Sequence, residues 1–179
     1  ALHQSLDYLF VFKQHDLHMD HAEEPVTLDT QLNANFPHLV DKRTAFGFRH
    51  VHQLDYATSG VLCVALNKKA AKLASSLFQR REVSKIYLAL VAEHTTWDVA
   101  ECDEGIGEDP TDPRGFRMAL ESSPNGCATP LPAHTDLVTV ARGYLHGKPV
   151  SKLLLRPHSG RRHQLRLHVK ALGHTIVGD

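Results

Sequence analysis

The chain has 179 residues, a formal net charge of zero and 42% hydrophobic residues. This length and composition suit a soluble globular protein whose core needs no disulfides. The apolar runs all fall short of the roughly 18 residues of a membrane span. Zero net charge also argues against the basic coat of a nonspecific nucleic-acid binder.

The cysteines and the two ends of the chain set further expectations. Cys63, Cys102 and Cys127 are an odd number in no zinc-binding spacing, so we predict a reduced intracellular protein with free thiols. The chain starts at Ala1 and ends after "GHTIVGD". We therefore expect one domain over 1–179, shortened at its C-terminus.

The first half of the chain predicts alternating strands and helices. Strands are expected, in chain order, at 8–12, 46–55 and 60–67 because these runs are apolar or β-branched. Leu28, Leu32 and Phe36 recur every four residues and predict a short amphipathic helix that Pro37 ends. A second helix is expected after Asn67, which has the side chain of an N-cap.

The second half predicts three longer strands around an irregular region. Strands are expected at 84–93, at 133–142 with a turn at Gly143, and at 150–157. Residues 94–134 hold most of the prolines and predict a turn-rich excursion with short strands. A turn at Ser159-Gly160 is followed by a helix. Without regular βαβ alternation, we expect an α+β fold with a largely antiparallel sheet.

A histidine-rich stretch, "HDLHMDH" at 15–21, raises the question of a metal site. His18 and His21 are three residues apart, but no second cluster has the spacing of metal ligands. A polar loop is therefore favoured over a metal site.

A single carboxylate, Asp55, stands in "HQLDYATSG" between two apolar runs. An aspartate there can cap the turn by accepting hydrogen bonds from the amides of Thr58 or Ser59. It can equally be a nucleophile or base at the end of a strand. The motif alone favours the turn.

A basic turn, "SGRRHQLRLH", adds weight to the interpretation of Asp55 as a nucleophile or base. Arg161, Arg162 and Arg166 lie where a turn opens a helix, a place that suits phosphate. Arg162 and Arg166 are four apart and are expected to share a helical face. Arginine holds a carboxylate through two parallel hydrogen bonds, so an Asp55–Arg166 pair would keep Asp55 ionised.

Tyr87 in "SKIYLALV" is a third candidate. Aromatic residues are common in strands for structural reasons alone. Its ring could also stack on an extruded base.

Three segments together resemble one family. "HQLDYATSGVLCVALN", "SKIYLALV" and "LLLRPHSGRRHQLRLHVKALGHTIVGD" resemble, in order, signatures of the RluA-type RNA pseudouridine synthases. "EGIGEDPTDPRGFRMAL" resembles a further segment more weakly. Within the family, the resemblance is strongest to the animal RNA pseudouridylate synthase domain-containing proteins.

The resemblance implies a catalytic fold with a mixed, mainly antiparallel sheet, flanking helices and a central cleft. It implies isomerisation of uridine in RNA to pseudouridine, without cofactor or metal and without a membrane. The matching catalytic residues are Asp55, Tyr87 and Arg166. The residues expected to contact RNA are His52, Gln53, Lys85, Arg161, Arg162 and His163. The RNA could be tRNA, rRNA or mRNA.

One departure from the family pattern concerns RNA binding. Gln53 stands where the family usually has arginine, so this position carries no charge. A catalytically weak relative that binds RNA is therefore an alternative function. A metal-dependent hydrolase that uses the histidine-rich loop is a more remote one.

Overall fold

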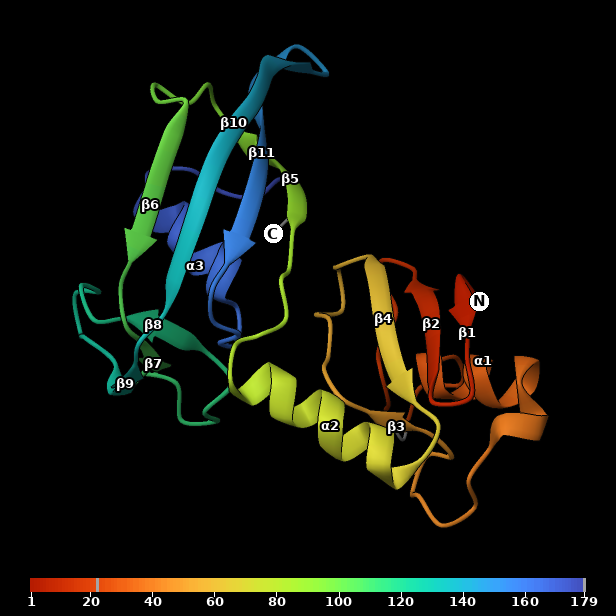
Figure 1. The fold of residues 1–179 in the computed structure, drawn as a ribbon. Helices are drawn as coiled ribbons and strands as arrows, with labels where there is room; N and C mark the ends of the chain where they lie inside the picture. The colour runs from red at the N-terminus through yellow and green to blue at the C-terminus, as the bar shows by residue number, and fades with distance from the viewer. Residues whose placement is uncertain (22, 179) are drawn as a thin grey trace. The chain divides into compact units, whose positions relative to one another are not determined.

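The structure is a computed structural model, and it describes residues 1–21 and 23–178. Its contacts divide the chain into two compact units, Ala1–Val83 and Ser84–Asp179. Each unit has its own sheet and its own buried residues, and each is described separately below (Figure 1).

The first unit is built on a four-stranded sheet in the order β1-β2-β4-β3. The strands are β1 (His3–Gln4), β2 (Tyr8–Lys13), β3 (Arg49–His50) and β4 (Gly60–Ala65), and every pairing is antiparallel. Side chains alternate in β2 and β4, so Leu9, Leu62 and Val64 are fully buried. The strand expected over 46–55 is wrong for most of its length, because only the two residues of β3 pair with β4.

Two α-helices accompany this sheet, α1 (Leu28–Asn35) and α2 (Lys68–Gln79), with a 3₁₀ turn at Pro37–Leu39. Thr27 and Thr30 form a reciprocal capping box at the start of α1. The predicted N-cap of α2 is confirmed, because the Asn67 Oδ1 accepts from the Ala70 amide at 2.9 Å. Both helices therefore begin where side chains satisfy exposed amides.

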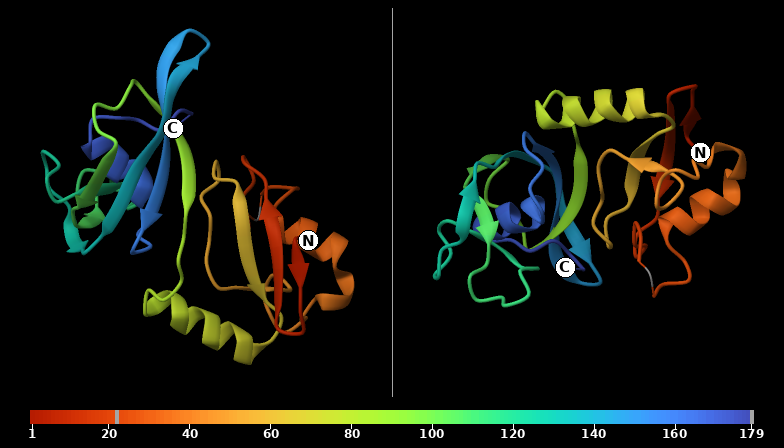
Figure 2. Two further views of the ribbon diagram at one scale, coloured as in Figure 1. Left: turned by 45° about the horizontal axis from the view of Figure 1, so that its top comes forward. Right: turned by 90° about the horizontal axis from the view of Figure 1, so that it is seen from below.

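The second unit contains an antiparallel sheet in the order β5-β11-β10-β6 (Figure 1). The strands are β5 (Tyr87–Ala92), β6 (Val99–Asp103), β10 (His134–Leu145) and β11 (Lys148–Pro157). The helix α3 (Gln164–Ala171) covers one face (Figure 2). Its Val169 packs with Leu137, Leu153 and Leu155 into a buried hydrophobic cluster. Burial of these side chains is the main force that holds helix and sheet together.

The turn between β10 and β11 lies later than expected. Gly143 is within β10, opposite Val150, and the chain reverses at His146-Gly147. Both turn residues have positive φ, 49° and 77°, as the two-residue turn of a twisted hairpin requires. The hairpin can therefore extend past Gly143, which occupies an ordinary strand position.

The irregular region predicted over 94–134 forms a second small sheet, in the order β8-β7-β9. Its strands are β7 (Ile106–Glu108), β8 (Met118–Leu120) and β9 (Ala128–Leu131). Ile106, Leu120 and Ala133 form its buried cluster, against which Leu167 of α3 packs. Pro110, Pro113 and Pro124 lie in the turns between these strands.

The α+β class is confirmed, and every described strand pair is antiparallel. Among the described residues, helices long and apolar enough to cross a bilayer are absent. The three cysteines are all free thiols.

Candidate active site

Asp55 lies on the loop that leads from β3 into β4. The preceding Leu54 is buried and anchors the loop, whereas Asp55 is exposed. The Thr58 amide donates to the Asp55 backbone carbonyl at 3.0 Å, which closes the turn. The Thr58 amide is thus used by the backbone, and the loop presents the Asp55 side chain toward solvent rather than in apolar surroundings.

A buried lysine anchors this loop through hydrogen bonds to its backbone. Lys13, the last residue of β2, is fully buried. Its ammonium group donates to the carbonyls of Asp55, Tyr56 and Thr58 at 2.9–3.0 Å, and to that of Gln14 at 3.1 Å. Burial lowers the pKa of Lys13, and the nearby charges of Asp55 and Asp16 act in the opposite direction. One cation therefore fixes the backbone from the Asp55 carbonyl to the Thr58 carbonyl.

Sequence reasoning did not single out Lys13, although the sequence carries a signal for it. Leu9 and Val11 point into the core, and Lys13 continues the same period-two series. A lysine at an inward position is expected to have several acceptors, because a buried charge is otherwise costly.

The two residues before Leu54 differ in their settings. His52 accepts from the Cys63 amide through Nε2 at 3.0 Å and stacks on Phe78 of α2, with ring centroids 4.8 Å apart. Gln53 is exposed. His52 thus helps to tie the loop to β4 and α2, whereas Gln53 faces solvent.

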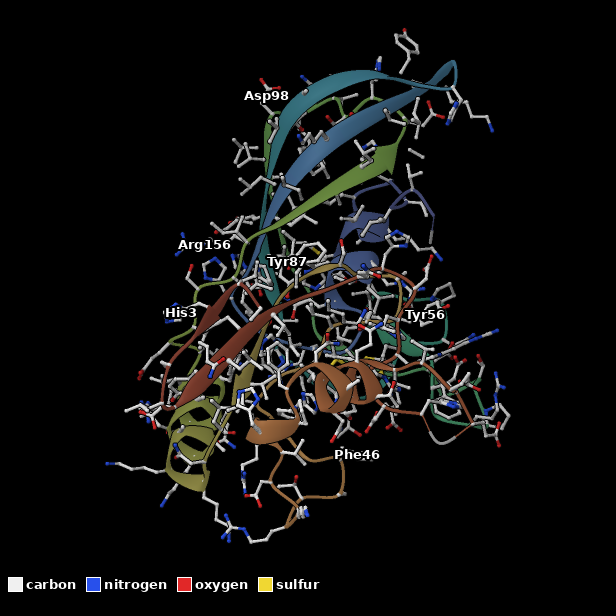
Figure 3. All side chains as sticks on the ribbon, turned by 90° about the vertical axis from the view of Figure 1, so that its right-hand side faces the viewer. His3, Phe46, Tyr56, Tyr87, Asp98 and Arg156 are labelled. Atoms are coloured by element: carbon white, nitrogen blue, oxygen red, sulfur yellow. The ribbon has the colours of Figure 1, made fainter. Side chains whose placement is uncertain are left out.

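Tyr87 begins β5 in the second unit, and Lys85 lies two residues before this strand. Tyr87, labelled in Figure 3, is half-buried and packs against the cluster beneath α3, together with Leu165 of that helix. Lys85 donates to the Ser159 carbonyl. A Cβ on Gly160 would lie 3.3 Å from the Lys85 ammonium nitrogen, so glycine permits this close approach. The Lys85 bond thereby joins the turn at Ser159-Gly160 to the segment that leads into β5.

Two buried polar residues shape the basic turn, and neither was singled out from the sequence. The Ser159 Oγ donates to the Gln164 Oε1 at 2.8 Å, and the same oxygen accepts from the Arg161 amide at 3.0 Å. The Gln164 amide group donates to the His134 carbonyl and the Thr135 hydroxyl, both at 3.0 Å. A buried glutamine with every group bonded gives the turn a single conformation.

The arginines of this turn have distinct partners. Arg161 donates to the Pro132 carbonyl at 3.2 Å, and Arg162 donates to the carbonyls of Gly115 and Phe116 at 2.6 and 2.9 Å. Arg162 lies before α3, which begins at Gln164. The prediction that Arg162 and Arg166 share a helical face is therefore wrong.

The start of α3 explains that error. His163 has the left-handed φ of 58° at the N-cap, so the chain turns sharply between Arg162 and the helix. Arg166 is an exposed residue of the first turns of α3. The structure thus places Asp55 in the first unit, and Tyr87, Lys85 and Arg166 in the second.

The histidine-rich stretch is a loop between β2 and α1. The ring of His18 lies 4.5 Å from that of Tyr56, and its Nε2 lies 3.8 Å from the Glu24 carboxylate. These contacts connect the loop to the residue after Asp55.

Comparison with known proteins bears on these loops directly. The RNA pseudouridylate synthase family matches residues 7–171, which include the Lys13 strand, the Asp55 loop, β5 and the basic turn. The chain belongs to the RluA-type RNA pseudouridine synthase family.

Relatives in this family span animals and bacteria. The chain is 47% identical over 180 residues to RNA pseudouridylate synthase domain-containing protein 1 of Mus musculus, with 99% of this chain and 58% of the relative covered. It is 34% identical over 136 residues to tRNA pseudouridine synthase C of Haemophilus ducreyi, covering 72% of this chain and 53% of the relative. The chain thus spans little more than half the length of these relatives.

Solved structures of pseudouridine synthase relatives share the fold. Human RNA Pseudouridylate Synthase Domain Containing 1 matches with a TM-score of 0.86 and 45% identity, covering 99% of this chain and 66% of that one. Human RNA Pseudouridylate Synthase Domain Containing 4 matches with a TM-score of 0.77 at 23% identity, covering 99% and 66%. The latter likeness is one of fold alone.

Proposed function

We propose that this protein is an RNA pseudouridine synthase, an intracellular isomerase that converts specific uridines in RNA to pseudouridine. The observation that carries the proposal is the Asp55 loop. It has the family's signature, and it exposes one carboxylate on a backbone that Lys13 fixes.

In the proposed reaction Asp55 attacks the ribosyl carbon or the uracil base. The bond between the ribosyl carbon and N1 of uracil breaks, the base turns, and the ribosyl carbon bonds to C5 while the bond to Asp55 breaks. C5 loses a proton and N1 gains one, so the product is an isomer of the substrate. This chemistry needs no cofactor. The uridine must leave its stack to reach Asp55, at a cost of a few kcal/mol that an unpaired loop in RNA lowers.

Residues of the second unit complete the proposed site. Arg166 and Tyr87 are proposed as the further catalytic residues: the guanidinium supplies a positive charge that favours an ionised carboxylate, and the Tyr87 ring stacks on the extruded base with its hydroxyl near the C5 proton. Lys85, Arg161, Arg162 and His163, with His52 and Gln53 of the first unit, are proposed to contact the RNA. The bonds from Arg161 and Arg162 to backbone carbonyls support a role in shaping the RNA-binding loop as well as in carrying charge.

The proposal is tested with RNA that carries tritium at C5 of uridine, since forming the new bond releases the label. We expect release by the purified protein on a fraction of total cellular RNA. We expect Asp55→Asn to abolish release, because the amide keeps the shape of the carboxylate and loses its charge.

The matched control is Asp20→Asn, the same change at an exposed position of the same unit. It should leave release unchanged. The proposal fails if the protein releases no label from any cellular RNA, or if Asp55→Asn remains active.

The alternative function is a catalytically weak relative that binds RNA. The exposed Gln53, at a position where the family usually has arginine, favours it. RNA binding with micromolar or tighter affinity, without label release, would establish this alternative instead.

A further inference from the structure

A cluster of side chains of the types that bind metals lies in the second unit, separate from the residues proposed for catalysis and RNA binding. His134 and Asp136 lie on β10, and His158 directly follows β11. One nitrogen or oxygen from each lies within 4.8 Å of the others. Within the described residues, this is the only group of three or more such side chains that could hold one ion.

The sheet brings these residues together from a separation that sequence spacing does not suggest. In the β10–β11 ladder, Thr135 is opposite Pro157 and Asp136 is opposite Arg156. The His158 amide donates to the His134 carbonyl at 2.9 Å, which continues the ladder by one step. His134 and His158 therefore face each other across the ladder, and Asp136 follows His134 by two residues on the same face.

The chemistry of the group suits a transition-metal ion. The Nε2 atoms of His134 and His158 lie 3.0 and 2.6 Å from the two carboxylate oxygens of Asp136. In a tetrahedral zinc site with bonds near 2.0–2.1 Å, neighbouring ligand atoms are roughly 3.3 Å apart. Small side-chain rotations would thus bring two imidazoles and one carboxylate to the positions of zinc ligands, with a fourth position left for water.

Asp103 of β6 adds a second observation that points to an ion. It pairs with His134 in register, and its Oδ1 lies 3.8 Å from the other ring nitrogen, Nδ1. Histidines that bind metals commonly present their second nitrogen to a carboxylate, which fixes the ring. Strand pairing already places the Asp103 carboxylate near this second nitrogen.

Local charge and access also favour a cation. Asp136 is flanked in register by Glu101 on β6 and by Arg156 on β11, which Figure 3 labels. Asp103 is in register with His134, so the strand-paired neighbours of the group include two carboxylates and one guanidinium. Side-chain exposures of 32% for His134, 39% for Asp136 and 41% for His158 leave the group open to an ion from solvent.

We propose that His134, Asp136 and His158 form a binding site for a divalent transition metal, with zinc the best match to two imidazoles and one carboxylate. The site is separate from the proposed isomerisation, which uses no metal. Its ligands share backbone with the basic turn, because the His134 amide donates to Ser159 Oγ and His158 precedes Ser159. A bound ion would therefore clamp the ends of β10 and β11 beside that turn.

The test is zinc titration of the purified metal-free protein by calorimetry, with cobalt absorption in the visible range as a report on ligand geometry. We expect one zinc ion per chain and a thermal midpoint that rises with zinc. His158→Ala and Asp136→Asn should each weaken binding about tenfold or more. Asp103→Asn should weaken it by about 10–100-fold, as expected for a carboxylate that orients a metal-bound histidine.

The control is the double variant His18→Ala, His21→Ala, which removes two histidines whose rings lie 5.1 Å apart and should leave binding unchanged. Thermal unfolding without zinc shows whether each variant is folded. The proposal is overturned if wild type binds no zinc at micromolar concentrations. It is also overturned if folded His158→Ala and Asp136→Asn both bind as wild type does, in which case the group is only a hydrogen-bonded His–Asp–His network.

Discussion

At the scale of single residues, two buried polar side chains stabilise the fold through hydrogen bonds to distant residues. Lys13 and His168 are both fully buried, yet each has hydrogen-bond partners from distant parts of its unit. Such groups stabilise one conformation, because a wrong one would leave them unpaired.

Replacing Lys13 by methionine should destabilise the protein and impair catalysis. The change removes the charged donor that the carbonyls of Asp55, Tyr56 and Thr58 share, and a hydrogen bond to a charged group contributes about 1.5–3 kcal/mol. We expect a loss of about 3 kcal/mol in the free energy of unfolding, measured by urea titration, and slower tritium release. Lys69→Met, at an exposed site on α2, should change neither. A Lys13→Met protein as stable and active as wild type would refute the assigned role.

His168 should make stability depend on pH below neutrality. Its Nδ1 lies 2.9 Å from the Thr135 hydroxyl oxygen, and burial lowers its pKa below 6.5, with Glu104 acting in the opposite direction. The unfolded chain therefore takes up a proton here at a pH where the folded chain does not. The free energy of unfolding should fall as pH drops below about 6.5.

Urea unfolding at pH 7.5 and pH 5.5 checks this expectation, with His168→Gln for comparison. The variant should lose less stability between the two pH values than wild type does. Glu104, Asp103 and His134 also act on His168 and remain in both proteins. An identical pH dependence in the variant would assign the effect to other groups.

At the scale of elements, the small sheet β8-β7-β9 depends on a close approach of two backbones. A Cβ added to Gly107 would lie 2.1 Å from the Ala128 carbonyl oxygen, and backbone cannot move aside cheaply. Gly143 in β10 has open space around its missing Cβ and an ordinary φ. Glycine is thus required sterically at position 107, whereas position 143 has room for a larger side chain.

Substituting alanine at each position tests this difference. Gly107→Ala should lower the free energy of unfolding by more than about 1 kcal/mol, because overpacking against backbone forces the strands apart. Gly143→Ala should be neutral or slightly stabilising, since it reduces the freedom of the unfolded chain. Thermal unfolding of both variants provides the measurement, and equal effects would show that the contact at Gly107 relaxes without cost.

At the scale of the whole molecule, zero net charge means that the proposed RNA binding depends on a few local cations. Gln53 lies exposed two residues before Asp55, so adding charge there should strengthen binding. Gln53→Arg is expected to tighten RNA binding and to steepen the dependence of affinity on salt. One new phosphate contact changes the slope of log K against log salt by about 0.7–0.9.

Filter binding over a range of salt concentrations measures that slope. Gln4→Arg, which adds the same charge at an exposed position on β1, is the control and should change the slope less. Unchanged binding by Gln53→Arg would show that position 53 does not contact RNA.

The sequence alone determined the local features of this protein. Asn67 predicted the start of α2, the apolar runs predicted β2, β4 and β5, and the order of three signatures indicated the family, because these depend on neighbours in the chain. It also identified Asp55, Tyr87 and Arg166 as candidates, and their catalytic roles stay predictions.

Tertiary structure decided what depends on residues far apart in sequence. Lys13 reaches the Asp55 loop across 42 positions, and Gln164 reaches His134 across 30, so neither partnership leaves a local pattern. The cluster of His134, Asp136 and His158 arises for the same reason, since strand register and not spacing brings its members together. Periodicity fixes which face of an element is buried, but only the pairing of elements fixes which polar groups meet.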